Sequence, residues 1–216
     1  MLFSVQGSDW ARRGANRQPR VEHDFERVHC DNIPMAHQFT TSYIVEALAS
    51  LRQYKRLAEG AMAQVSDDQL IAALDAEMNS ISTIVKHMTG NMRSRWTDFL
   101  TTEGEKPDRN RDDEFVAPPA TRAALMETWD QGWALMFQVI EPLADSDLSR
   151  TVMIRGEGHS VMQAINRQIA HYASHTGQII LLAKHFKGDQ WQSLSVPRNR
   201  SAEYDANVAV GKASQR

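Results

Sequence analysis

The strongest constraint on the fold is one long amphipathic segment, Ser160–Gly188. Ser160 and Gln163 form a capping-box pattern at its start, and Gly188 is a typical residue just beyond a helix end. Apolar residues recur between these positions with helical spacing, which predicts a single helix of ~27 residues and roughly 40 Å. A helix of this length is unusual in a small globular protein and typical of a helical bundle.

Two histidines stand four residues apart on this predicted helix. His171 and His175 therefore share one face, and their imidazoles can converge on a single point. Two histidines that converge from a rigid element are a common half of a transition-metal site. Because the chain contains eight histidines, the spacing by itself leaves a metal site and a coincidence equally open.

Three further segments carry apolar stripes with helical spacing: residues 36–65, 79–100 and 121–141. Residues 66–78 begin with an N-cap pattern and predict a short turn of helix. Residues 148–154 resemble a short strand, which residues 155–161 can extend into a hairpin. The sequence therefore predicts an all-α protein, a four-helix bundle with a short β-hairpin between the third and fourth helices.

His87 lies in the middle of the second predicted long helix. Asn91 and Arg95 follow it at i+4 and i+8, so the three side chains share one face. A lone helical histidine is more often a hydrogen-bonded core or surface residue than a metal ligand. Here, however, the polar row borders an apolar stripe, which is how a bundle lines an interior pocket. Arg167 stands one turn before His171 and can join this row.

The flanks and one internal loop differ from the rest of the chain. Residues 1–34 are polar and aperiodic, so we predict a disordered extension ahead of a bundle over residues 35–198. Residues 199–216 are predicted to form a mobile tail. Residues 101–118 are a long charged loop, which is either functional or a solvated connection, and we favour the connection.

Composition excludes several classes of protein. The net charge of −3 does not favour nucleic-acid binding. No apolar run approaches the ~18 residues that a membrane-spanning helix needs, and the first residues lack the pattern of a signal peptide. A single cysteine rules out a disulfide framework. We therefore expect a cytoplasmic protein that works without a membrane.

Three segments resemble the DinB/YfiT-like superfamily, and within it a bacterial branch of unassigned activity: residues 79–107, 150–186 and 191–198. The similarity covers roughly residues 35–198. It implies a DinB-like four-helix bundle in which three histidines hold a divalent metal, either zinc or nickel. The matching positions in this chain are His87, His171 and His175. The resemblance also implies a homodimer.

Relatives in that superfamily include bacillithiol-dependent S-transferases, a mycothiol-dependent isomerase and metal-dependent hydrolases. We therefore expect a metal-dependent enzyme with an open three-histidine site, and our first choice is a transferase that uses bacillithiol, mycothiol or glutathione. The alternatives are a hydrolase with metal-activated water and a non-catalytic metal- or ligand-binding stress protein. No catalytic residue can be named, and the lack of a glutamate in an HExxH pattern weakens the hydrolase alternative.

Two further expectations concern the substrate and the assembly. Asn91, Arg95 and Arg167 are predicted to bind an acidic small-molecule substrate or thiol, because arginine pairs with carboxylates through charge-assisted hydrogen bonds. Four aromatic residues exceed what one bundle core usually needs: Trp96, Phe99, Trp129 and Trp133. Some of them are therefore predicted to lie at a dimer interface.

Overall fold

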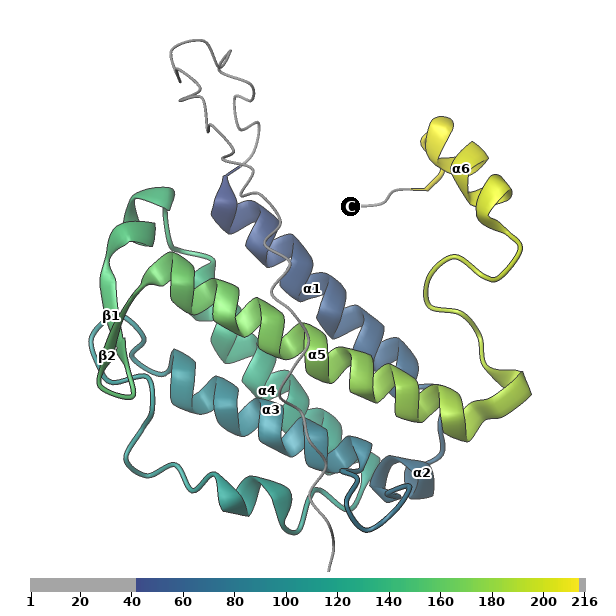
Figure 1. Ribbon diagram of the computed structural model, residues 1–216, viewed down its shortest axis with the longest axis horizontal. Helices are drawn as coiled ribbons and strands as arrows, with labels where there is room; N and C mark the ends of the chain where they lie inside the picture. Colours follow the sequence, from purple (N-terminus) through teal and green to yellow (C-terminus); the bar gives the residue numbers. More distant parts are fainter. Residues whose placement is uncertain (1–41, 214–216) are drawn as a thin grey trace, which may run out of the picture. The chain divides into compact units, whose positions relative to one another are not determined.

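The structure is a computed structural model of the chain, and it describes residues 42–213 (Figure 1). The predicted disordered extension, residues 1–34, lies outside the described residues. The elements are α1 (Tyr43–Met62), α2 (Asp67–Ile71), α3 (Ile81–Trp96), η2 (Asp112–Phe115), α4 (Arg122–Ile140), η3 (Asp145–Ser149), β1 (Thr151–Ile154), β2 (Glu157–Ser160), α5 (Val161–Lys187), η4 (Gly188–Gln190) and α6 (Ser201–Ala209), where η denotes a 3₁₀ turn.

Side-chain caps determine where the four long helices begin. Ser42, Ser80, Thr121 and Ser160 each accept a hydrogen bond from the backbone N–H three residues later. A cap of this kind is typically worth ~1 kcal/mol. Ser160 also completes the predicted capping box, and α5 ends at Lys187, followed by Gly188, whose positive φ of 59° suits glycine. The long helix predicted from the sequence is confirmed.

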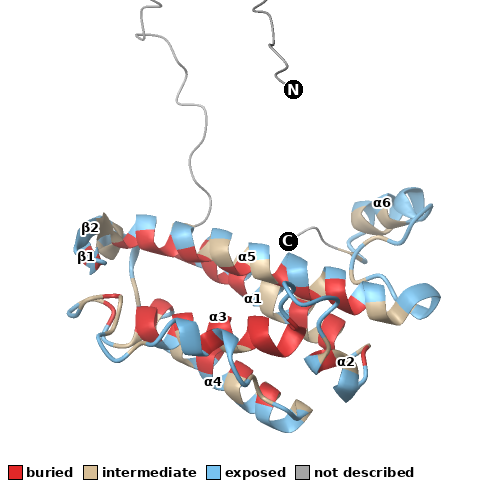
Figure 2. Ribbon diagram, turned by 60° about the horizontal axis from the view of Figure 1, so that its bottom comes forward, coloured by how far each residue is buried: buried red, intermediate tan, exposed pale blue. Residues whose placement is uncertain are grey.

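The helices α1, α3, α4 and α5 pack as a bundle (Figure 1). The closest pairings are α3 with α4 and α1 with α5, and α3 also packs against α5. The buried residues lie on the faces that these helices turn toward one another (Figure 2). Within residues 42–213, no helix is both long enough and apolar enough to cross a membrane.

The four aromatic residues predicted at an interface lie inside this core. Trp96, Trp129 and Trp133 are fully buried within the single chain, and Phe99 is 3% exposed. Trp96 packs on Phe99, and Trp129 on Trp133. Placing them at an interface was therefore wrong, because one bundle core has room for all of them. The homodimer itself stays a prediction.

The second helix and the hairpin differ in extent from their predictions. Helix α3 ends at Trp96 rather than at residue 100, and Asp98 has a left-handed φ of 49° that no α-helix accommodates. Strand β1 begins at Thr151, because the preceding residues form η3. The two strands pair antiparallel, and a two-residue turn at Arg155 and Gly156 joins them, with φ of 56° and 76°.

The hairpin is attached to the loop that follows α3. The Glu103 carboxylate accepts hydrogen bonds from the backbone N–H groups of Arg155, at 2.6 Å, and Gly156, at 3.1 Å. The N–H of Gly104 donates to the carbonyl of Met153 at 2.8 Å. These contacts hold the turn, and with it Arg155, against the residues that follow α3. Near the other end of the chain, α6 forms where only a mobile tail was predicted, and it buries no residue.

Candidate metal centre and adjoining cavity

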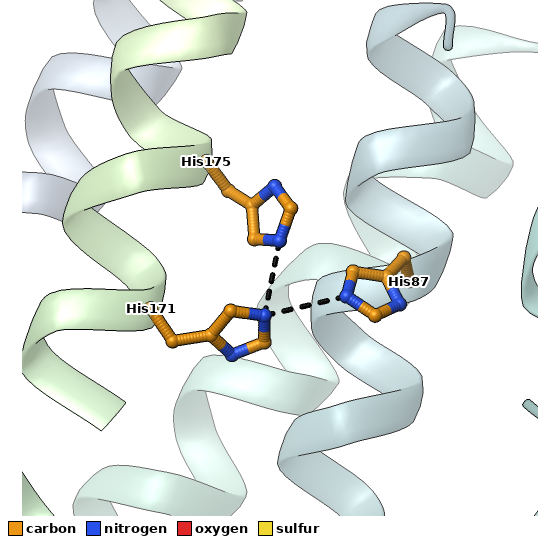
Figure 3. A group of neighbouring side chains, drawn as sticks. All are labelled: His87, His171 and His175. Atoms are coloured by element: carbon orange, nitrogen blue, oxygen red, sulfur yellow. Dashed lines mark hydrogen bonds between the residues drawn. The ribbon is translucent and has the colours of Figure 1, made fainter. Parts of the chain in front are cut away.

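Three histidines from two helices converge on one point between α3 and α5 (Figure 3). His171 Nε2 lies 3.3 Å from His87 Nε2 and 3.0 Å from His175 Nε2. Their three candidate ligand atoms all lie within 4.8 Å of one another. Three nitrogens bound to a tetrahedral zinc ion at ~2.0–2.1 Å would be about 3.3 Å apart. Two of the three spacings are close to this value, so the group could hold one divalent ion, and the predicted convergence of the three residues is confirmed.

The hydrogen bonds behind two of these rings decide which nitrogen carries the proton. His87 Nδ1 lies 2.8 Å from Glu114 Oε2, and His175 Nδ1 lies 2.7 Å from Gln178 Oε1. Both oxygens only accept, so each Nδ1 donates and each neutral ring presents its Nε2 lone pair to the cluster. His171 Nε2 can donate a hydrogen to only one of these lone pairs. A cation shared by the three nitrogens would satisfy all of them at once.

The protonation of the cluster also suits a metal. Burial, together with the smaller effects of the neighbouring His175 and His87, lowers the pKa of His171 to about 3. Burial likewise lowers the pKa of His175. These two rings are therefore neutral at physiological pH, which is the form that binds a metal ion.

Glu114 supports the centre from the loop between α3 and α4. Its side chain is buried, and its carboxylate accepts two hydrogen bonds from Arg109, at 2.7 and 2.9 Å, in addition to the one from His87. Burial alone would raise the pKa of Glu114, but the hydrogen bonds from His87 and Arg109 hold this pKa below its ordinary value. A carboxylate behind a histidine ligand fixes the ring's orientation and raises its basicity.

Sequence reasoning missed Glu114. It favoured a solvated connection for residues 101–118, and this is wrong for Arg109 and Glu114, whose side chains are largely buried. The available signal was Phe115, an aromatic residue in an otherwise charged stretch. Its ring stacks on His87 with the centroids 5.0 Å apart, which brings this part of the loop against the centre. Nothing in the spacing along the chain indicates that approach.

A cavity of about 340 Å³ adjoins the centre, with His87 and His171 in its wall. It is lined by His87, Asn91, Arg95, Arg109, Arg111, Arg155, Arg167, Gln168 and His171. All three predicted substrate-binding residues therefore lie in its wall, beside two of the histidines. The remaining three arginines were not predicted, because they come from the charged loop and the hairpin turn rather than from a helix face.

Two of the predicted residues are buried in different ways. Asn91 Oδ1 accepts a hydrogen bond from the Tyr172 hydroxyl at 3.2 Å, which ties Asn91 to the core. Arg95 is 3% exposed, and its only ion pair within residues 42–213 is a long one of 3.8 Å between Nη2 and Glu105. Burial lowers the pKa of Arg95, and the charge of Glu105 partly opposes this effect. Nε and Nη1 of Arg95 have no hydrogen-bond partner among the described residues.

The comparisons with known proteins define a family for this chain. The family described as "Protein of unknown function (DUF1572)" matches residues 38–200. This range contains the three histidines, Glu114 and the whole lining of the cavity. None of the curated proteins matches the chain.

Proposed function

This chain belongs to the DUF1572 family of unknown function, and we propose that it is an enzyme whose three-histidine centre holds a divalent metal, zinc or nickel. One observation carries the proposal. Hydrogen bonds to Glu114 and Gln178 turn two Nε2 lone pairs toward a third imidazole that can satisfy only one of them. The resemblance to the DinB/YfiT-like superfamily points to the same metals.

The arrangement also supports a reactive rather than a purely structural site. Three protein ligands leave the fourth position of a tetrahedral ion free, whereas structural zinc sites use four. A bound ion would supply Lewis acidity there and lower the pKa of a coordinated thiol or water. The chain itself contributes the orientation of His87 through Glu114, and a cavity beside the centre that can receive a small molecule.

We favour thiol transfer over hydrolysis as the reaction. Both oxygens of Glu114 are engaged by His87 and Arg109, so this carboxylate is not free to take a proton from an attacking water. A thiol that coordinates a metal is deprotonated without a separate base. The arginines of the cavity suit the carboxylates of an acidic thiol such as glutathione or bacillithiol. We therefore propose a low-molecular-weight-thiol S-transferase or a related thiol-dependent enzyme.

The metal is tested by elemental analysis of the purified protein. We expect close to one zinc or nickel ion per chain, lost in the His87→Ala and His171→Ala variants. His185→Ala is the matched control, because His185 is exposed in the last turn of α5, and it should keep its metal. Absence of metal, together with variants that titrate zinc and nickel like the wild type, would refute a metal centre.

The reaction is tested by turnover of electrophilic and hydrolysable small molecules, with and without bacillithiol, mycothiol and glutathione. Turnover that requires one of the thiols and disappears in His171→Ala is the expected result. Cleavage that needs no thiol would replace the transferase with a hydrolase. Metal binding without turnover in either assay would favour a binding protein.

A further inference from the structure

We propose that the cavity beside the histidines is a receptor for a compact group with at least two negative charges, a phosphate or a vicinal dicarboxylate, carried by the substrate. This proposal deepens the proposed function. It rests on that function only for the statement that the bound molecule is a substrate. The recognition of the anion itself stands on the cavity alone, because it depends on arginines rather than on a metal.

The first argument is the balance of charge. Five arginines line the cavity, and no acidic residue of the described chain does: Arg95, Arg109, Arg111, Arg155 and Arg167. Two carboxylates behind the wall pair with some of them. Glu105 lies within 4 Å of three of these guanidinium groups, and Glu114 pairs with Arg109. Five positive charges thus pair with two carboxylates, which leaves an excess of positive charge around one small space.

The second argument is the number of unsatisfied polar atoms. Arg111 and Arg167 have no carboxylate within ion-pair distance anywhere in residues 42–213. In the described part of the chain, two nitrogens of the buried Arg95 have no hydrogen-bond partner, and neither does Oε1 of the buried Gln168. Buried groups such as those of Arg95 and Gln168 are rarely left unpaired in a folded protein, whereas the exposed Arg111 and Arg167 are solvated and free to meet an incoming anion. An oxyanion would occupy the arginine donors, and a hydroxyl or acid proton on the same ligand would suit Gln168.

The third argument is the position of Arg155. It occupies the first position of the hairpin turn with a φ of 56°, where asparagine, aspartate or glycine is normally found. The Glu103 carboxylate holds this turn by accepting from two consecutive backbone N–H groups. Burial alone would raise the pKa of Glu103, but its backbone hydrogen bonds keep this pKa low and the clamp ionised. Backbone strain maintained in this way is characteristic of functional sites, and here it delivers a guanidinium to the cavity.

The arrangement of the arginines selects the class of anion. They reach the cavity from α3, from the loop after it, from the hairpin turn and from α5. A single carboxylate carries one negative charge and two oxygens, so it would leave much of the positive charge around the cavity without compensation. A phosphate, or two carboxylates on adjacent carbons, presents oxygens in several directions and can engage three or more donors at once.

Titration calorimetry at constant ionic strength tests the receptor with three probes: inorganic phosphate, succinate and acetate. We expect phosphate or succinate to bind about tenfold or more tightly than acetate. The tighter of the two identifies the source of the charge, phosphate ester or dicarboxylate. Equal binding of all three probes, or no binding of phosphate and succinate, would overturn the inference.

Arginine variants show whether the cavity is responsible. Arg155→Gln and Arg167→Gln should each weaken binding of the preferred anion about tenfold or more. Arg56→Gln is the matched control, because Arg56 is exposed on α1 and does not line the cavity, and it should bind like the wild type. Wild-type affinity in both cavity variants would refute the receptor.

The His175→Ala variant separates this inference from the proposed function. It removes one nitrogen of the metal centre, and His175 does not line the cavity. Anion binding that persists in this variant supports the receptor, whatever the metal assays show. Binding that is lost in His175→Ala but retained in both arginine variants would mean that phosphate coordinates only the metal, and would overturn the inference. A protein that contains metal and uses thiols but binds none of the anions would leave the proposed function intact and refute the receptor.

Discussion

A substitution at Gly90 tests the role of Glu114. It lies three residues after His87 on α3, and a Cβ added there would stand 2.5 Å from Glu114 Oε1, 2.9 Å from its Cδ and 3.1 Å from its Cγ. A methyl carbon cannot approach the atoms of a carboxylate side chain this closely. The Glu114 side chain must therefore move in Gly90→Ala. The position it must leave is the one from which it bonds His87 and Arg109.

The effect should fall on metal binding more than on folding. Alanine in place of glycine inside a helix contributes roughly 0.5–1 kcal/mol to stability, which offsets part of the loss of hydrogen bonds to a charged group, worth roughly 1.5–3 kcal/mol. Loss of a carboxylate behind a metal-bound histidine typically weakens metal affinity by about 10–100-fold. Gly90→Ala should therefore remain folded and bind zinc about 10–100-fold more weakly than the wild type.

Competition with a chromogenic chelator measures the zinc affinity of Gly90→Ala, of Glu114→Gln and of a control, Gly177→Ala. Gly177 follows His175 by two residues on α5, and nothing lies within 4 Å of an added Cβ there. The control should bind zinc like the wild type. Wild-type affinity in Gly90→Ala and Glu114→Gln would show that Glu114 does not tune the centre. An equal loss in Gly177→Ala would attribute the effect to the helix backbone instead.

Two further predictions concern pH and assembly. In the metal-free protein the pKa of His171 is about 3 in the folded state against 6.5 ordinarily, so the unfolded chain binds more protons between these values. The free energy of unfolding should be steady just above pH 6.5 and fall as the pH drops from 6.5 toward 3. Denaturant titrations in the presence of a chelator measure it, and a free energy of unfolding that increases as the pH drops would contradict the prediction. We also propose a homodimer, for which light scattering at micromolar concentration should give twice the chain mass, whereas a monomer mass would refute it.

Local patterns in the chain were sufficient to predict most of the helices. Caps such as Ser160 with Gln163, and apolar stripes with helical spacing, involve neighbouring residues only, so they can be recognised without a fold. The shared helix face of His171 and His175 could be predicted in the same way, because a helix places residues four apart on one side. Bringing His87 to them required the packing of α3 against α5, which the resemblance implied and spacing along the chain could not show.

The sequence by itself thus determined the bundle helices, the hairpin and the pair of histidines, whose causes are local. Only the tertiary structure decided that Glu114 supports His87, because a loop can place a carboxylate anywhere within its reach. The same holds for Arg155, which reaches the cavity through a turn clamped by Glu103. The tertiary structure also decided that Trp129 belongs to the core rather than to an interface. Both environments favour the same apolar side chain, and only packing distinguishes them.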